Sequence, residues 1–131
     1  MERDLVPVLV PVLVVDDLPS YRRAVAGVIA VTDGFELAGE AASGEEALSF
    51  LREHPVGVVL MDVNMPGMGG LEAARLIRCR HPEVLVVLLS VAAADDLPAG
   101  ALAGGAHYRH KDRFGPDELE ALWHDGGSGG S

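Results

Sequence analysis

Five polar residues of this chain have the types and the spacing to carry out chemistry together. Asp16 and Asp17 end one apolar run, and Asp62 ends another. Ser90 ends a third run, and Lys111 follows a weaker strand candidate, Ala106–His110. A hydrophobic core does not need these groups. Carboxylates, a hydroxyl and an ammonium that converge on one crevice are the components of phosphoryl transfer onto an aspartate.

The three aspartates also predict a metal site. Carboxylates within a few ångströms of one another raise one another's pKa unless a cation lies among them. Mg2+, a hard divalent ion with oxygen ligands, removes that repulsion. Lys111 would neutralise the remaining charge and hold a phosphoryl oxygen as a point charge, and Ser90 would offer its hydroxyl to the same oxygen. Nine of the ten cationic residues are Arg, so Lys111 is the only lysine.

The apolar runs that end in these residues predict the strands of one parallel sheet. The runs are continuous rather than alternating, which indicates strands that are buried on both faces and covered by helices. Ligands of such sheets bind beyond the carboxyl ends of the strands, where the polar residues lie. The predicted strands are Val8–Val15, Phe35–Ala41, Val56–Met61, Val84–Leu89 and Ala106–His110.

Segments with helical spacing separate the strands, and the alternation predicts a three-layer α/β sandwich with right-handed crossovers. Ser43 and Glu46 form a capping box at the start of the second helix. The segment Ala92–Gly105 contains Pro98 and several glycines, so a short, mobile fourth helix is expected there. The other predicted helices are Ser20–Val31, Gly44–His54, Leu71–Arg80 and Asp117–His124.

Composition excludes several classes of protein. A chain of 131 residues with 49% hydrophobic and 23% charged residues is typical of one globular domain. The lone Cys79 cannot form an internal disulfide and suits a cytoplasmic location. No apolar run approaches the ~20 residues that span a bilayer. A net charge of −10 argues against direct nucleic-acid binding.

Several motifs, in order, resemble the receiver domain of two-component response regulators, from about Val8 to Trp123. They are the acidic pair in VLVVDD, the loop VVLMDVNMPGMGGLEA around Asp62, LLS ending at Ser90, and Y-x-x-K over Tyr108 and Lys111. The resemblance implies a CheY-like, flavodoxin-like (βα)5 fold with strand order 2-1-3-4-5. It also implies a conformational switch that is not an enzyme beyond catalysing its own phosphorylation and dephosphorylation.

The resemblance further implies a role for each site residue. Asp62 would be the phosphoacceptor, and Lys111 and Ser90 would hold the acyl phosphate. Asp17, Asp62 and the backbone carbonyl of Asn64 would bind Mg2+ directly, and Asp16 would bind it through water. Ser90 and Tyr108 resemble the hydroxyl–aromatic switch pair of the family.

The His-Lys-Asp sequence at residues 110–112 is similar to the LuxR/NarL subfamily. That similarity implies a sensor histidine kinase as phosphoryl donor, a DNA-binding output domain in the full-length protein, and a possible homodimer. Residues 1–125 would form the receiver domain. Residues 126–131, GGSGGS, resemble an engineered linker.

Other interpretations remain open at this point. Ser90 could be a plain strand-end hydroxyl, and Tyr108 could be a half-buried aromatic on an edge strand. Strand five is more polar than its relatives, with Arg109 and His110 in place of aliphatic residues. The chain could therefore be an atypical receiver that dimerises or docks partners without phosphorylation. An aspartate-nucleophile phosphatase ranks last, because Asn64 stands where those enzymes carry a second aspartate.

Overall fold

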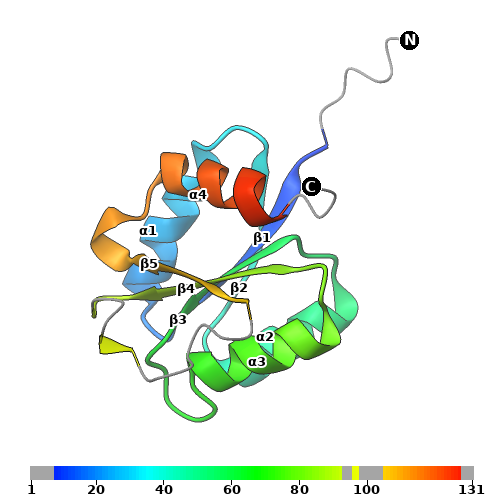
Figure 1. The fold of residues 1–131 in the computed structure, drawn as a ribbon, viewed down its shortest axis with the longest axis vertical. Helices are drawn as coiled ribbons and strands as arrows, with labels where there is room; N and C mark the ends of the chain where they lie inside the picture. The colour runs from blue at the N-terminus through cyan, green and yellow to red at the C-terminus, as the bar shows by residue number, and fades with distance from the viewer. Residues whose placement is uncertain (1–7, 93–95, 98–104, 128–131) are drawn as a thin grey trace.

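The computed structural model describes residues 8–92, 96–97 and 105–127, in which strands and helices alternate (Figure 1). The strands are β1 (Val10–Val15), β2 (Phe35–Ala41), β3 (Val58–Asp62), β4 (Leu85–Ser90) and β5 (His107–His110). The helices are α1 (Pro19–Ala30), α2 (Gly44–Glu53), α3 (Gly70–Arg80) and α4 (Pro116–Leu122). Two short helical turns complete the described elements, the 3-10 turn η3 (Lys111–Arg113) and the π turn η4 (Trp123–Gly127).

The five strands form one sheet in the order β2-β1-β3-β4-β5, and every neighbouring pair is parallel. This confirms the predicted fold. The strand order reverses between β1 and β3, and ligands of such sheets bind beyond the carboxyl ends of the strands at this point. Asp62, the last residue of β3, pairs with Leu89 of β4.

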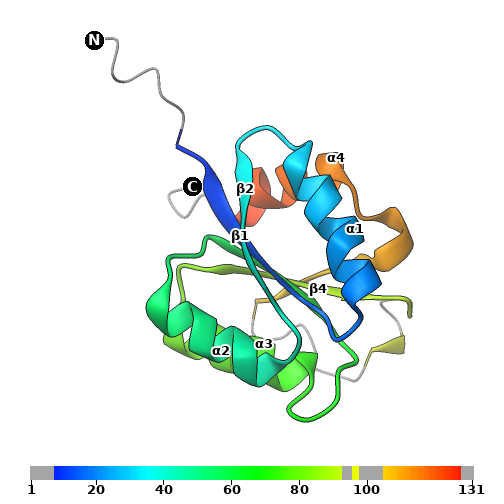
Figure 2. The same cartoon turned by 180° about the vertical axis from the view of Figure 1, so that it is seen from behind.

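Helices cover both faces of the sheet, with α1 and α4 on one side and α2 and α3 on the other (Figure 1, Figure 2). Alternate residues of β1 belong to two separate cores. Val12 and Val14 face the α1–α4 side, whereas Leu13 and Val15 face the α2–α3 side. All four are at most 1% exposed. Burial on both faces explains why the apolar run is continuous.

Local sequence signals set the start of several helices. Ser43 caps α2, because its Oγ accepts a 3.1 Å hydrogen bond from the backbone N–H of Glu46. The Glu46 carboxylate in turn accepts from the N–H of Ala42 at 2.9 Å, one residue before the cap. The predicted capping box is thus confirmed, except that the Glu46 side chain bonds to the N–H of Ala42 rather than to that of Ser43. Pro19 and Pro116 lie in the first turns of α1 and α4, where a missing N–H costs nothing.

Four predicted strands begin too early, β1 and β3 by two residues each and β4 and β5 by one. β1 starts at Val10, whose N–H donates to the Gly34 carbonyl at 2.8 Å, and Val8 is 93% exposed. β3 starts at Val58 rather than Val56 and continues through Asp62, which places the acidic residue inside the ladder. Hydrophobicity alone does not mark where pairing begins, because an apolar residue can extend beyond the neighbouring strand.

The last helix is shorter than predicted. α4 ends at Leu122 and continues as the π turn η4. The predicted fourth helix and the mobility expected within Ala92–Gly105 fall mainly on residues 93–95 and 98–104, outside the described residues. η4 extends to Gly127, and the rest of the predicted linker is also outside them. Within the described part of the chain, no helix has the length and hydropathy to cross a membrane.

Candidate functional site

Three carboxylates converge at the carboxyl ends of β1 and β3. One oxygen each from Asp16, Asp17 and Asp62 lies within 4.8 Å of the other two. Asp16 and Asp62 are 1% and 6% exposed, and Asp17 is exposed. The structure thus brings together the three aspartates predicted as a cluster. Oxygen donors at this spacing fit a hard divalent cation such as Mg2+.

Lys111, the first residue of η3, places its ammonium against two of these carboxylates. Its Nζ donates to Asp16 Oδ2 at 2.9 Å and lies 3.3 Å from Asp62 Oδ1. Burial lowers the pKa of Lys111, but hydrogen bonding to Asp16 and the charge of Asp62 outweigh burial and raise the pKa above its ordinary value. The ammonium therefore stays charged at neutral pH and offsets part of the negative charge of the cluster.

Asp62 has a raised pKa in this environment. Burial is the largest cause, and the charge of Asp16 raises the pKa further. The charge and hydrogen bond of Lys111 lower it, as does a backbone hydrogen bond from Asn64, without cancelling the rise. A divalent cation beside the carboxylates would favour the ionised form of Asp62.

Hydrogen bonds from three directions hold Asp16. Its Oδ1 accepts from the N–H of Leu18 at 2.9 Å, and its Oδ2 accepts from Lys111. Its carbonyl oxygen accepts from Arg22 Nη1 at 2.6 Å. Arg22 also forms a 3.0 Å ion pair with Glu40 of β2. Arg22 therefore ties the acidic turn after β1 to both α1 and β2.

Ser90 and Tyr108 meet at one backbone turn after β4. Ser90 is 1% exposed, and its Oγ accepts from the N–H of Ala92 at 3.0 Å. The Tyr108 hydroxyl donates to the carbonyl oxygen of Ala92 and lies 3.5 Å from that of Ser90. A hydroxyl that accepts still has its own proton to donate. Ser90 can therefore donate to a further oxygen, while Tyr108 contacts the same turn from β5.

All four residues of β5 are half-buried. The polar character predicted for strand five thus fits its place at the edge of the sheet. Tyr108 is one of these four residues, so its exposure does not distinguish a switch residue from a plain aromatic residue on an edge strand. Its hydrogen bond to the Ala92 carbonyl is the feature that links it to Ser90.

A glycine-containing loop connects Asp62 to α3. Gly67 and Gly69 have φ angles of 79° and 80°, in the left-handed region that favours glycine. Gly70 lies so close to β3 that a Cβ added there would overlap the carbonyl oxygen of Asp62. The loop can pass beside the end of β3 only because Gly70 has no side chain. Asn64, within this loop, is exposed.

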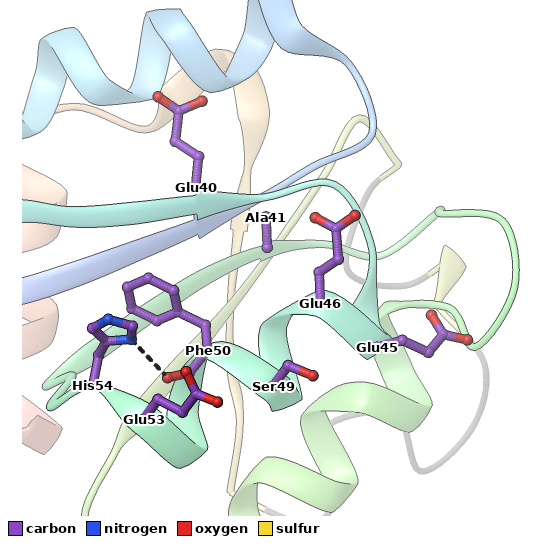
Figure 3. Close-up of a pocket in the computed structure, with 8 residues that line it drawn as sticks. All are labelled: Glu40, Ala41, Glu45, Glu46, Ser49, Phe50, Glu53 and His54. Atoms are coloured by element: carbon purple, nitrogen blue, oxygen red, sulfur yellow. Dashed lines mark hydrogen bonds between the residues drawn. The ribbon is translucent and has the colours of Figure 1, made fainter.

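A second acidic region lies beside α2. A groove there is lined by Glu40, Ala41, Glu45, Glu46, Ser49, Phe50, Glu53 and His54 (Figure 3). The rings of Phe50 and His54 stack with their centroids 4.3 Å apart. The four glutamates are exposed, and together they would repel an anionic ligand. No residue of the carboxylate cluster is among those that line the groove.

Two residues at the cluster were missed by sequence reasoning. Arg22 carries no motif that distinguishes it from Arg23 in the same helix. Tyr21 lies within the predicted helix Ser20–Val31 and carries no site motif, yet Lys111 Nζ lies 4.3 Å from the centroid of its ring. The contact of Tyr21 with Lys111 and the ion pair of Arg22 with Glu40 join different elements of the fold, so no local signal could have identified them.

Comparison with known proteins places this chain in a family. Residues 12–123 match the family described as the response regulator receiver domain. The chain is 45% identical over 115 residues to the response regulator GacA of Pseudomonas viridiflava, covering 87% of this chain and 54% of that protein. It is 39% identical over 115 residues to the response regulator UvrY of Escherichia coli K12, covering 87% and 53%. The chain thus spans about half the length of these curated relatives.

Solved structures agree with the match. The signal receiver domain of a NarL response regulator from Mycobacterium tuberculosis superposes with a TM-score of 0.82 and 31% identity, over 94% of this chain and 99% of that one. The response regulator domain of Thermotoga maritima CheB gives a TM-score of 0.78 and 26% identity, over 88% and 95%. The chain belongs to the receiver-domain family of two-component response regulators.

Proposed function

We propose that Asp62 accepts a phosphoryl group with the help of Mg2+, and that the resulting acyl phosphate switches the conformation of the domain. The observation that carries this proposal is the contact of one half-buried lysine ammonium with two buried carboxylates. Lys111 lies 2.9 Å from Asp16 Oδ2 and 3.3 Å from Asp62 Oδ1. Burying three such charges is costly, and a site that must bind and transfer an anion explains why they lie together.

The cluster suits Mg2+ in a particular arrangement. Asp17 and Asp62 would bind the ion directly, together with the carbonyl oxygen of Asn64. Both carboxylate oxygens of Asp16 already accept hydrogen bonds, from Leu18 and Lys111, which supports an indirect role through water. When bound, the ion would neutralise charge on the transferring phosphoryl group.

The chain's own residues account for the rest of the step. An oxygen of Asp62 forms a bond to phosphorus while the bond from phosphorus to the donor's leaving atom breaks, and that atom departs with the electron pair. Lys111 would then hold an oxygen of the phosphoryl group, and the Ser90 hydroxyl would donate to another. The turn at Ala92 would move with Ser90, and Tyr108 would follow because its hydroxyl is bonded to that turn.

The setting of this switch is proposed from the relatives. A sensor histidine kinase would supply the phosphoryl group, and a DNA-binding output domain would respond in the full-length protein. Residues 1–125 would be the receiver domain and 126–131 a linker, with a homodimer as a further expectation. A cytoplasmic location fits the exposed free thiol of Cys79. The domain would catalyse only its own phosphorylation and dephosphorylation.

Intact mass after incubation with acetyl phosphate and Mg2+ tests the proposal. The parent chain should gain one phosphoryl group, and EDTA should prevent the gain. Asp62→Asn should gain nothing, whereas Glu53→Gln, which neutralises a carboxylate in the groove beside α2, should match the parent. Equal phosphorylation of Asp62→Asn and the parent would rule out Asp62 as the acceptor.

Failure of the parent to gain mass, with Mg2+ binding shown separately, would favour a receiver that docks partners without phosphorylation. The family assignment does not favour that alternative or an aspartate-nucleophile phosphatase. The same mass measurement therefore decides between the switch and the docking module.

A further inference from the structure

Tyr21 contacts the phosphoryl-transfer site without belonging to the predicted set of site residues. It lies in the first turn of α1, directly after the acidic turn, and its ring is half-buried. Lys111 Nζ lies 4.3 Å from the ring centroid. A cation within about 6 Å of a ring centroid, over the ring face, is attracted by the quadrupole of the ring.

The simplest role for such a ring is packing. Tyr21 does pack against the core beneath α1 and α4, as Phe114 does. Packing alone does not account for an ammonium over the ring, because a charged group adds nothing to a hydrophobic contact. Burial, followed by the charges of Asp16 and Asp62, raises the pKa of Tyr21 to about 12. The phenol therefore stays neutral and does not add a fourth negative charge to the cluster.

We propose that Tyr21 is a positioning residue whose ring holds the Lys111 ammonium in place while the carboxylates beneath it change partners. This inference rests on the proposed function of the site. Phosphorylation would convert the Asp62 carboxylate into an acyl phosphate, and a bound cation would compete with Lys111 for Asp16 and Asp62. The ring of Tyr21 is unchanged by either event, so it stabilises the ammonium throughout. A long, flexible lysine side chain then loses less freedom when it binds the phosphoryl oxygen.

The single lysine of this chain allows the contact to be observed directly. Lysine-selective 13C labelling gives one side-chain signal set, from Lys111. Protons above an aromatic face shift upfield, so the Hε resonances of Lys111 should be upfield of a free lysine. Tyr21→Phe should keep this shift and Tyr21→Leu should abolish it. The absence of an upfield shift in the parent would overturn the proposal.

Kinetics test the positioning role. Tyr21→Leu should slow phosphorylation by acetyl phosphate about three- to tenfold, whereas Tyr21→Phe should stay within about twofold of the parent. The Kd for Mg2+, measured by calorimetry, should be unchanged in both. Phenylalanines with one to three ring fluorines at position 21 should slow the reaction stepwise, because fluorine weakens the quadrupole and barely alters the shape.

Phe114→Leu is the matched control, because it removes a half-buried ring from the edge of the same core and leaves the ring over Lys111. It should lower stability as Tyr21→Leu does, and leave the rate unchanged. If Phe114→Leu slows phosphorylation equally, or if fluorination of the ring at position 21 leaves the rate unchanged, Tyr21 is only a packing residue. If the parent takes up no phosphoryl group, the proposed function fails, and the lysine signal still decides whether the ring contact exists.

Discussion

This chain carries two acidic regions that differ in burial and in the placement of positive charge. The cluster of Asp16, Asp17 and Asp62 includes two nearly inaccessible carboxylates and faces the half-buried ammonium of Lys111. The groove beside α2 is lined by exposed glutamates from β2 and α2 (Figure 3). Arg22 connects the two regions, through the Asp16 carbonyl and the Glu40 carboxylate.

The difference shows that a count of carboxylates does not identify a site. Exposed carboxylates are solvated and screened, so their proximity costs little and implies little. Buried carboxylates cost free energy unless a cation accompanies them, and the fold retains them at the cluster. Variants of the cluster should therefore change stability and Mg2+ binding far more than variants of the groove.

Removal of the buried ammonium should have the largest effect. Lys111→Met leaves Asp16 and Asp62 buried without their cation, and the free energy of unfolding should fall by about 3 kcal/mol without metal. Mg2+ should recover part of this loss, because it replaces the missing positive charge. Urea unfolding in EDTA and in Mg2+ measures both. Arg52→Met, beside the groove on α2, should change stability by less than about 0.5 kcal/mol, and equal losses would remove the contrast.

A side chain at Gly70 should displace Asp62 and destabilise the fold. The added Cβ of Gly70→Ala overlaps the Asp62 carbonyl oxygen, so the free energy of unfolding should fall by about 2 kcal/mol. Mg2+ binding should weaken as well. Gly27→Ala, in α1 with nothing near its added Cβ, should instead stabilise by about 0.5–1 kcal/mol. Thermal unfolding of both variants gives the comparison, and matching signs would contradict it.

Loss of the link between the two regions should have an intermediate effect. Arg22→Ala removes the bond to the Asp16 carbonyl and the pair with Glu40, at a cost of about 1 kcal/mol. Mg2+ affinity should fall a few-fold, because the acidic turn is held less firmly. Calorimetric titration tests this, with the exposed neighbour Arg23→Ala as control. An unchanged Mg2+ affinity in Arg22→Ala would show that Arg22 does not support metal binding through the acidic turn.

Neutralising Asp62 should stabilise the metal-free protein. The gain in the free energy of unfolding should be smaller than the loss caused by Lys111→Met. The pKa of Asp62 is raised in the fold. Its protonated form therefore contributes stability that is fully present below the unfolded pKa and is lost as pH rises through the folded pKa. Asp62→Asn should be more stable than the parent at pH 7 in EDTA, and the difference should shrink in acid. Stability curves at several pH values measure it, and a less stable Asp62→Asn at pH 7 would show that Lys111 outweighs burial.

Charge removal in the groove should have the smallest effect. Glu45→Gln and Glu53→Gln should each change the free energy of unfolding by less than about 0.5 kcal/mol. Any change should fade in high salt, since exposed charges are screened. Mg2+ should stabilise both variants as much as the parent. A loss of Mg2+ response in either would extend the metal site into the groove.

Much of the fold follows from short-range patterns. Continuous apolar runs predicted the three buried central strands β1, β3 and β4, because residues that pack on both faces of a sheet leave no polar alternation. Ser43 predicted the start of α2 through a hydrogen bond made within four residues. Strand ends were less accurate, as at Val8 and Val56, because apolar character does not show where the neighbouring strand stops.

The candidate site likewise combines features predicted from the sequence with contacts that only the fold creates. The sequence places polar residues at the strand ends, and the parallel arrangement predicts that Lys111 meets Asp16, Asp17 and Asp62. The packing of the folded chain adds that the Lys111 ammonium bonds to Asp16 and lies over the ring of Tyr21. These features differ in the sequence separation over which their interactions act. Hydrophobic periodicity and capping act between neighbours in the chain, whereas the contacts of an ammonium depend on how separate helices and strands pack.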